Sequence, residues 1–458
     1  MTMALSRRQF FVLAAGAFLQ PGPGSGKRDM MVRAVRPQDL EMPLSGFADY
    51  ITPIDRFFVR SHVYAPRVAA DGWQLTVAGE VNTALTLTLD DLHRMPAVEL
   101  VGVLECAGNG RGFYEPSVPG LQWAHGAVGN GRWRGARLSD VLKRAGLKPS
   151  ARAILFNGAD VPVGTMPDFQ RSIPLSKALD SDTLLAYEMN GEVLPVEHGF
   201  PVRVVVPGWT GNSWIKWLTS ISVLDTEHDG FWMARAYRHP GKPVPPATAV
   251  PPERMQPVTS LRVKSVIAAP LDGSRAISNQ PITIRGTAWG GEAPVAAVDV
   301  SVDGGRSWRP ASLRREERTK FGWRRWEHQW TPSREAYYTI LARAHDAAGN
   351  TQPFDQEWNP SGYGWNVVQR TAVNVVNELS GDAPGARTAA PGMAPPAAFK
   401  TSCVTCHDDD VVRQQRLTRG QWEAEINKMI NWGAKVPVED RDTLLDYLVG
   451  TAGPRLRN

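Results

Sequence analysis

Residues 379–400, LSGDAPGARTAAPGMAPPAAFK, follow neither the period of an amphipathic helix nor the alternation of a strand. Alanine, proline and glycine dominate this stretch, and such a composition is typical of a linker without a packed core. As a flexible coil it would span on the order of 25 Å. The chain of 458 residues therefore cannot be a single domain. We predict a linker over residues 379–398, a long body before it and a tail over residues 399–458.

The body itself divides into two patterns. Residues 30–255 alternate short apolar runs such as WQLTVAGEV and FPVRVVVPGW with Gly/Pro turns, and their clearest helical pattern is LSDVLKRAG at 138–146. This mixture predicts an α+β domain. Residues 258–377 hold regularly spaced strand patterns, among them QPITIRGTAW and YYTILARAHDAAGN, with turns at 303–305 and 346–350. About six or seven such strands predict a β-sandwich of immunoglobulin type.

Composition narrows the classes of function. The formal net charge is +5 and the 51 lysines and arginines form no long run, so nucleic acid binding is not expected. The hydrophobic content of 42% and charged content of 21% are ordinary for a globular protein. The 16 tryptophans and 36 prolines favour strands and irregular loops over a helix bundle.

The N-terminus has the pattern of an export signal. Arg7 and Arg8 precede a short apolar run at 10–19 and then a stretch rich in proline and glycine. The run is too short to span a bilayer, so it predicts a signal peptide over residues 1–26 and no integral membrane anchor. The twin arginines indicate the twin-arginine route, which exports folded proteins, and hence a periplasmic location.

The residues of the tail that indicate a bound cofactor form the motif CVTCH. Cys403 and Cys406 are separated by two residues and His407 follows directly, which suits haem c: each thiol binds a vinyl group and the imidazole ligates the iron. A zinc half-site and a dithiol redox pair are the alternatives, but no later cysteine or histidine completes a zinc site. Met429, the only methionine after the motif, is the candidate for the second axial ligand.

Two amphipathic patterns surround this methionine, TRGQWEAEINKMINWG and PVEDRDTLLDYLVG, and both predict helices. The tail resembles the small class I cytochromes c over about residues 399–453. It is therefore expected to form a small all-α cytochrome c domain.

The third cysteine of the chain, Cys106, stands in ECAGNGR between an apolar run and two glycines. It has no disulfide partner left, and a lone cysteine is by itself most often a small buried hydrophobe. Its surroundings indicate more. The body resembles the sulfite oxidase family of molybdenum enzymes over about residues 40–377, through DRFFVRSH, ECAGNGR, GLQWAHGAVGNGRWRGARLSDVL, LLAYEMNGEVLPVEHGFPVRVVVPGWTGNSWIKWL and WNPSGYGWNVV.

The resemblance implies a cofactor site. Molybdenum in that family is held by two sulfurs of molybdopterin and one protein thiolate, and Cys106 matches the thiolate. Gly108 and Gly110 would let the backbone approach a bulky cofactor closely. The residues that match the family's pterin-binding segments, and that suit a phosphate and a pterin edge, are His198, Arg203 and Lys216.

The resemblance also implies a substrate pocket. Arg60 matches an arginine that binds the oxyanion substrate, and Arg111 matches a second pocket arginine; the planar guanidinium suits a small oxyanion such as sulfite. Tyr237 matches a tyrosine beside the oxo group of the metal, and His62 and Trp123 fall near the pocket.

One departure bears on the substrate. Many family members carry a further arginine near a Trp-Asn-x-x-Gly segment, whereas this chain has Pro360 and Ser361 there. Its loss would weaken anion binding or change the substrate, and Arg370, which is nearby in sequence, has no assigned place.

The activity implied by the resemblance is oxidation of sulfite to sulfate by oxygen-atom transfer. Electrons would pass singly to the haem and then to an external acceptor, a soluble periplasmic cytochrome c, and the sandwich would form a homodimer. A sulfane dehydrogenase that acts on another sulfur species is the alternative within the family. From a different class, the chain could be an electron carrier whose molybdenum domain is inactive.

Overall fold

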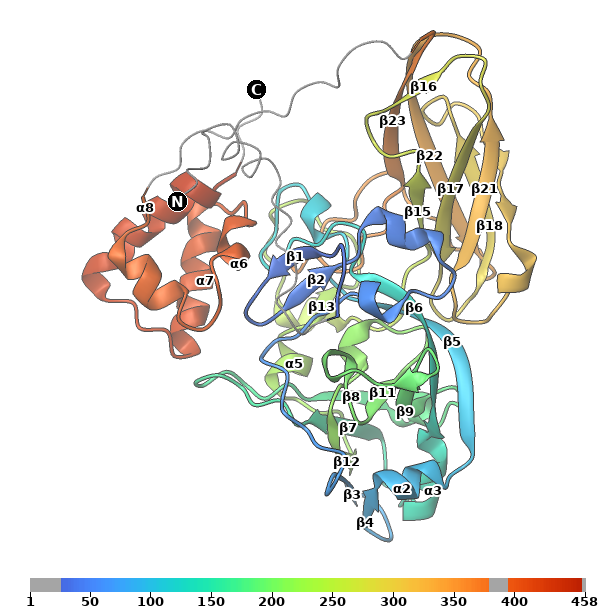
Figure 1. The fold of residues 1–458 in the computed structure, drawn as a ribbon. Coiled ribbons are helices and arrows are strands. Elements are labelled where there is room, and N and C mark those ends of the chain that lie inside the picture. Colours follow the sequence, from blue (N-terminus) through green and yellow to red (C-terminus); the bar gives the residue numbers. More distant parts are fainter. Residues whose placement is uncertain (1–25, 379–393, 455–458) are drawn as a thin grey trace, which may run out of the picture.

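The computed structural model describes residues 26–378 and 394–454, so the predicted signal peptide and most of the predicted linker lie outside the described residues. Three parts follow one another along the chain: an N-terminal part (26–257), a sandwich (258–378) and the tail (394–454) (Figure 1). The mixed α+β fold class is confirmed for the body. In the described part of the chain, no helix is both long and apolar enough to cross a membrane.

The N-terminal part is built on two five-stranded sheets. One sheet has the order β10-β9-β6-β5, with β11 on β9, and its strands are β5 (Ala97–Glu105), β6 (Val128–Arg137), β9 (Leu184–Met189), β10 (Glu192–Val193) and β11 (Arg203–Val205). The other has the order β4-β3-β12-β7-β8, and its strands are β3 (Gln74–Gly79), β4 (Leu85–Thr88), β7 (Ala153–Gly158), β8 (Arg171–Pro174) and β12 (Leu218–Leu224). Two antiparallel strand pairs complete the N-terminal part. They are β1 (Met31–Ala34) with β2 (Asp39–Glu41) and β13 (Arg238–Pro240) with β14 (Met255–Pro257).

Short helices cover these sheets: α2 (Leu89–His93), α3 (Leu138–Ala145), α4 (Leu175–Ala178) and α5 (Phe231–Ala234). The helix predicted at 138–146 is confirmed as α3, whose buried side chains Leu138, Val141, Leu142 and Ala145 recur at helical spacing. Gly146 ends α3 with φ of 70°, a left-handed conformation that glycine adopts without strain.

The sandwich consists of two sheets that enclose their own apolar core. Its first sheet, β15-β17-β21-β20, is formed by β15 (Lys264–Ala269), β17 (Ile282–Trp289), β20 (Ser312–Leu313) and β21 (Arg324–Trp330). Its second, β16-β23-β22-β18-β19, is formed by β16 (Ser274–Ile277), β18 (Val295–Ser301), β19 (Arg309–Pro310), β22 (Ala336–Asp346) and β23 (Gln369–Val376). The strand patterns read from the sequence of this part are confirmed, and side chains of both sheets, among them Ile284, Val298 and Val373, form the core.

The tail is helical throughout its described residues. Its elements are the π-helix Phe399–Cys403, α6 (Asp410–Arg413), α7 (Arg419–Asn431), the 3-10 helix Val438–Asp440 and α8 (Arg441–Ala452). A capping box between Thr418 and Gln421 begins α7. The predicted linker ends two residues too late, because Ala397 and Ala398 already belong to the first helical turn of the tail.

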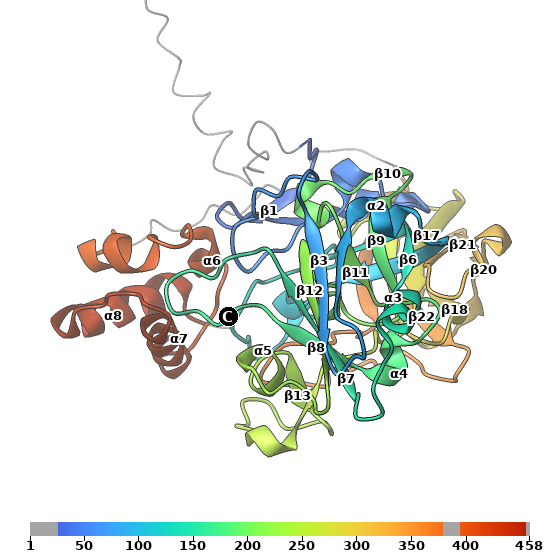
Figure 2. The same ribbon diagram turned by 90° about the horizontal axis from the view of Figure 1, so that it is seen from below.

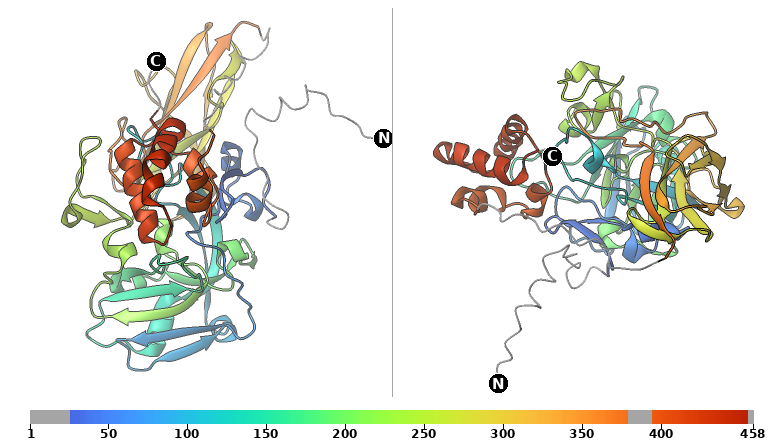
Figure 3. Two further views of the ribbon diagram at one scale, coloured as in Figure 1. Left: turned by 90° about the vertical axis from the view of Figure 1, so that its left-hand side faces the viewer. Right: turned by 90° about the horizontal axis from the view of Figure 1, so that it is seen from above.

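The tail packs against one flank of the N-terminal part, on the side away from the sandwich (Figures 1 and 2). It meets the β1–β2 hairpin, a loop at 117–122 and a loop at 160–168 next to α5 (Figure 3). These three segments are far apart in sequence and frame one opening of the body.

Candidate active site

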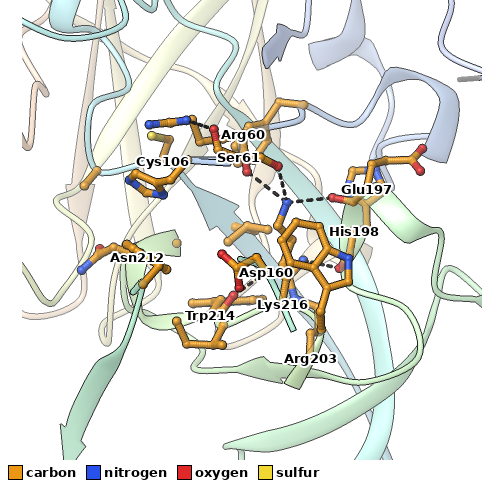
Figure 4. Close-up of a pocket in the computed structure, with 18 of the residues that line it drawn as sticks. Arg60, Ser61, Cys106, Asp160, Glu197, His198, Arg203, Asn212, Trp214 and Lys216 are labelled. Carbon is orange, nitrogen blue, oxygen red and sulfur yellow. Dashed lines mark hydrogen bonds between the residues drawn. The ribbon is translucent and has the colours of Figure 1, made fainter. Parts of the chain in front are cut away.

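Seven of the predicted site residues line one cavity of the N-terminal part, which has an empty volume of about 730 Å³ (Figure 4). They come from the loop before β3, the end of β5, the loops around β11 and the start of β13. The seven are Arg60, His62, Cys106, His198, Arg203, Lys216 and Tyr237.

Cys106 lies at the end of β5, where the strand turns away from its neighbour. Its backbone N–H donates to Ala127 O over 2.9 Å, and its carbonyl accepts from Asn109 N over 2.9 Å, so the turn is fixed on both sides. Burial raises the pKa of the Cys106 thiol, although the guanidinium groups of Arg60 and Arg111 oppose this shift. A soft metal that binds the sulfur would displace its proton.

At Gly108 and Gly110, the two glycines after Cys106, side chains of the protein lie where a Cβ atom would stand. A Cβ atom on Gly108 would meet the guanidinium of Arg111 at 2.7 Å, and one on Gly110 would meet the Trp365 ring at 2.5 Å. Gly110 also has φ of 87°. Protein side chains thus occupy the space where a Cβ atom would lie, which is one reason for glycine at both positions, while the close approach of a cofactor stays a prediction.

The floor of the cavity is basic and desolvated. Arg203 donates to His198 O over 2.9 Å and to Trp214 O over 3.0 Å, while its Nε has no hydrogen-bond partner. Burial lowers the pKa of Arg203 to about 9 and that of Lys216 to about 7. A buried guanidinium without a carboxylate partner is costly unless an anion joins it, so this floor suits a phosphate-bearing group.

Lys27 adds a cation on the outer side of His198. Its Nζ lies 2.7 Å from His198 Nε2 and donates to Phe57 O over 3.0 Å. Burial lowers the pKa of Lys27 to about 8 and holds the pKa of His198 well below its ordinary value. The imidazole is therefore neutral, and because Nε2 accepts from the ammonium, Nδ1 carries the proton.

Arg60 lies at the rim of the cavity beside a buried carboxylate. Its Nη1 is 3.4 Å from Asp39 Oδ1, and Ser61 N donates to the same oxygen over 3.0 Å. Burial raises the pKa of Asp39 to about 6, although Arg60 opposes the shift. The charge of Arg60 is therefore balanced only while Asp39 is ionised.

Tyr237 and His62 form a neutral pair next to Arg60. The Tyr237 hydroxyl lies 2.8 Å from His62 Nε2, and the Tyr237 ring stacks on Tyr363 with centroids 5.2 Å apart. Burial, with Arg60 nearby, holds the pKa of His62 well below its ordinary value, and burial raises the pKa of Tyr237. Tyr237 has φ of 51°, a strained backbone of the kind that is often found at functional sites.

Arg111 does not line this cavity. Its guanidinium lies 5.0 Å from the Tyr363 ring centroid and donates to Leu121 O and Ser361 O over 3.3 and 3.2 Å. It is thus held between the Cys106 turn and the segment that has Ser361 in place of the expected arginine. Trp123 is fully buried in the hydrophobic core, and it does not line the cavity either.

A second cavity lies between the tail and the body, with an empty volume of about 1420 Å³. The four residues predicted to hold a haem, Cys403, Cys406, His407 and Met429, all line it. The other tail residues of its wall are mostly apolar, among them Leu417, Trp422, Ile426 and Leu448. His407 Nδ1 donates to Asp408 O over 2.8 Å, which leaves Nε2 free to bind a metal.

The two cavities have two wall residues in common. Arg60 and His62 line both, so the Cys106 cavity and the tail cavity meet at one rim. Two stretches of sequence nearly three hundred residues apart thus form neighbouring sites.

Four other residues at or near the cavity were not predicted from the sequence. Asn212 and Tyr363 lie inside quoted motifs and could have been picked from them, whereas nothing in the sequence marks Asp39 or Asp160. Asp160 lines the cavity, and burial raises its pKa to about 6. These carboxylates can be recognised as part of the site only in the folded protein, where they lie next to the basic groups.

Comparisons with known proteins agree with this geometry. Residues 62–232 match the oxidoreductase molybdopterin binding domain, and residues 255–376 match the Mo-co oxidoreductase dimerisation domain. The mitochondrial sulfite oxidase of Rattus norvegicus is 39% identical over 363 residues, which are 76% of this chain and 66% of that protein. The sulfite oxidase of Arabidopsis thaliana is 33% identical over 363 residues, which are 73% of this chain and 91% of the plant protein.

Among solved structures, the sulfane dehydrogenase SoxCD from Paracoccus pantotrophus is similar with a TM-score of 0.63 and 27% identity. The match covers 82% of this chain and 93% of that chain. The matched residues span 66% of the rat and human sulfite oxidases, slightly less than two thirds, but most of the plant protein. With both domain models matched in order around the Cys106 cavity, the chain belongs to the sulfite oxidase family of molybdopterin oxidoreductases.

Proposed function

We propose that this protein is a molybdenum- and haem-dependent sulfite dehydrogenase that oxidises sulfite to sulfate and passes the electrons through its tail. The observation that carries the proposal is the common rim of Arg60 and His62 between the Cys106 cavity and the tail cavity. Oxidation of sulfite takes one oxygen atom from water and releases two electrons and two protons. A neighbouring one-electron carrier suits that reaction.

The Cys106 cavity fits molybdopterin. The Cys106 thiolate would be the protein ligand of the metal, and the basic floor of His198, Arg203 and Lys216 would bind the phosphate and the pterin edge. The unpartnered Arg203 Nε supports this fit, because it is buried and needs an acceptor. When bound, the molybdenum cofactor supplies oxygen-atom transfer and takes up two electrons.

Arg60 is the candidate for holding the substrate anion, whereas Arg111, which does not line the cavity, would act on the anion only through its charge. Arg60 lies at the rim of the cavity, and Arg111 lies behind the Cys106 turn with its charge unpaired by any carboxylate within the described residues. Neutral His62 and Tyr237 are joined by a hydrogen bond of 2.8 Å, so each holds the other in place beside the cavity.

The tail cavity fits haem c. Cys403 and Cys406 would attach the haem, and His407 and Met429 would bind its iron. The His407 tautomer and the apolar wall support this assignment. The external acceptor is a soluble periplasmic cytochrome c, which must accept electrons twice for each sulfite oxidised.

Location and assembly complete the proposal. The protein is exported by the twin-arginine route through Arg7 and Arg8, a motif that lies outside the described residues. The match of residues 255–376 to a dimerisation domain supports a homodimer through the sandwich.

A sulfane dehydrogenase activity is the second candidate. Ser361 stands where many family members carry an arginine, and the structural similarity to a sulfane dehydrogenase supports this reading. A substrate with less anionic charge would need fewer arginines.

Anaerobic mixing of the metal-loaded protein with sulfite tests the proposal, with the haem absorption bands as the readout. We expect rapid haem reduction in the wild type and none in Cys106→Ser, while dithionite reduces the haem in both. If sulfite leaves the wild-type haem oxidised while dithionite reduces it, sulfite is not the substrate. The sulfane dehydrogenase activity is then the better proposal.

A further inference from the structure

Lys27 joins three segments of the N-terminal part next to the Cys106 cavity. Its Nζ donates to Ile54 O and, over 3.0 Å, to Phe57 O, in the segment that leads to Arg60. The third acceptor is His198 Nε2, which lies 2.7 Å away and belongs to a residue 171 positions later in the sequence. An ammonium group has three N–H bonds, and these three acceptors can use all of them.

The segment that carries Lys27 is fixed on the body by its neighbours. Arg28 N donates to Asp55 O over 3.1 Å, and the Met30 side chain is buried in an apolar cluster. The Lys27 side chain is itself fully buried, with Glu197 Oε1 3.8 Å from its Nζ. Because its partners surround it, the ammonium is held in one place beside the imidazole.

The contact with Lys27 determines which nitrogen of His198 can act toward the cavity. The His198 ring lines the cavity, and it is neutral because burial holds its pKa well below the ordinary value. A neutral imidazole has one N–H and one acceptor nitrogen. Nε2 accepts from Lys27, so Nδ1 carries the N–H, and within the described residues Nδ1 has no hydrogen-bond partner.

We infer that Lys27 is a positioning residue of the cofactor site, which keeps His198 as an Nδ1–H donor toward the phosphate or the pterin edge of molybdopterin. This rests on the proposed function only in that the Cys106 cavity holds that cofactor. Without the ammonium, the imidazole can also carry its proton on Nε2. Nδ1 would then meet an anionic oxygen as one acceptor facing another, and a hydrogen bond to a charged group would be lost.

The first measurement is the rate at which the full-length, molybdenum-loaded protein loses its cofactor. The molybdenum and pterin that stay with the chain are followed over time after transfer into cofactor-free buffer. Lys27→Met removes the ammonium and keeps an apolar stem, and it should speed the loss at least about tenfold.

Asp29→Asn is the matched control for this measurement. It breaks an ion pair of the same segment, in which Asp29 lies 3.6 Å from Arg56 and is mostly exposed, and it leaves the contact of Lys27 with His198 in place. Because exposed pairs contribute little, this variant should lose its cofactor at the wild-type rate.

A double-mutant cycle separates an effect through His198 from a general effect on the fold. His198→Asn keeps an N–H donor near the place of Nδ1 and has no atom at the place of Nε2. In this background Lys27→Met should change the rate of loss by less than about threefold. A role of Lys27 in stability alone would give the same change in both backgrounds.

Nitrogen NMR of the full-length protein, labelled in its histidine rings, reports the tautomer directly. The His198 signals are identified by their absence from His198→Asn. They should show the proton on Nδ1 in the wild type and in Asp29→Asn, whereas Lys27→Met should move the proton wholly or partly to Nε2. The wild-type spectrum tests the inference even if Lys27→Met does not fold.

The outcomes distinguish the role of Lys27 from the proposed function. A wild-type ring protonated on Nε2, an unchanged rate of loss in Lys27→Met, or an equal change in both backgrounds would overturn the positioning role and leave sulfite oxidation untouched. Wild-type protein that retains molybdopterin, but whose haem sulfite does not reduce, would overturn the proposed function and leave the role of Lys27 intact.

Discussion

At the residue scale, the balance of charge around Arg60 depends on Asp39. Asp39 is almost fully buried, and its pKa is raised to about 6 by that burial. Above this pH the carboxylate is ionised and neutralises Arg60, which lies 3.4 Å away; below it the charge of Arg60 is uncompensated. Affinity for a small anion should therefore rise as the pH falls through about 6.

Sulfate, which is not oxidised, tests this as an inhibitor of sulfite oxidation. Its inhibition constant should fall severalfold between about pH 7.5 and pH 5 in the wild type. Asp39→Asn removes the titrating group while keeping its shape, so sulfate binding should be tight and independent of pH. Asp160→Asn is the control, because Asp160 also titrates near 6 but lies beside Lys216. If Asp39→Asn keeps the wild-type pH profile, another group controls the anion site.

At the element scale, the sandwich holds the strand that ends in Cys106. Glu105, the last residue of β5, accepts from Lys264 Nζ of β15 over 3.1 Å, from Trp289 Nε1 of β17 over 2.8 Å and from Asn109 Nδ2 over 2.8 Å. The Glu105 and Lys264 side chains are 8% and 3% exposed. The sandwich therefore does more than provide a surface for dimerisation, since it fixes the turn that presents the thiol.

Lys264→Met should lower the free energy of unfolding by about 3 kcal/mol, because it leaves the Glu105 carboxylate buried without its cation. The double variant Glu105→Gln with Lys264→Met should recover at least about half of this loss, since neither charge remains. Denaturant unfolding measures both. Lys320→Met, which breaks an exposed pair with Asp182, should cost less than about 1 kcal/mol. Equal losses in the single and double variants would show that Lys264 contributes through packing alone.

At the scale of the whole molecule, the docked tail restricts access to the active site. The tail and the body together line the cavity that includes Arg60 and His62, so a substrate that reaches these residues from this side passes between them. A small anion needs less room there than a sulfur atom carried on a protein surface, and we therefore expect sulfite to react faster than a protein-bound sulfane.

We expect kcat/KM for sulfite to exceed that for a peptide bearing a cysteine persulfide by about a hundredfold or more. Gly164→Ala, whose Cβ atom would lie 2.6 Å from Trp432 O of the tail, should narrow the difference, whereas Gly72→Ala, whose Cβ atom meets no atom within 4 Å, should not. Comparable values for the two substrates in the wild type would show that the substrate enters by a route that the tail does not cover, and would favour the sulfane dehydrogenase reading.

The local features could be predicted from the sequence alone. They are the strands of the sandwich, α3 and α7, the CVTCH motif and the donor types around Cys106. These follow from hydrophobic period, turn residues and short spacings, which act over a few residues. The contacts between groups that are distant in sequence, in contrast, follow from the tertiary structure. It placed Asp39 beside Arg60 and Lys27 beside His198, kept Arg111 out of the cavity wall, and seated the tail over the common rim. Such contacts depend on the packing of segments hundreds of residues apart, and no local pattern encodes them.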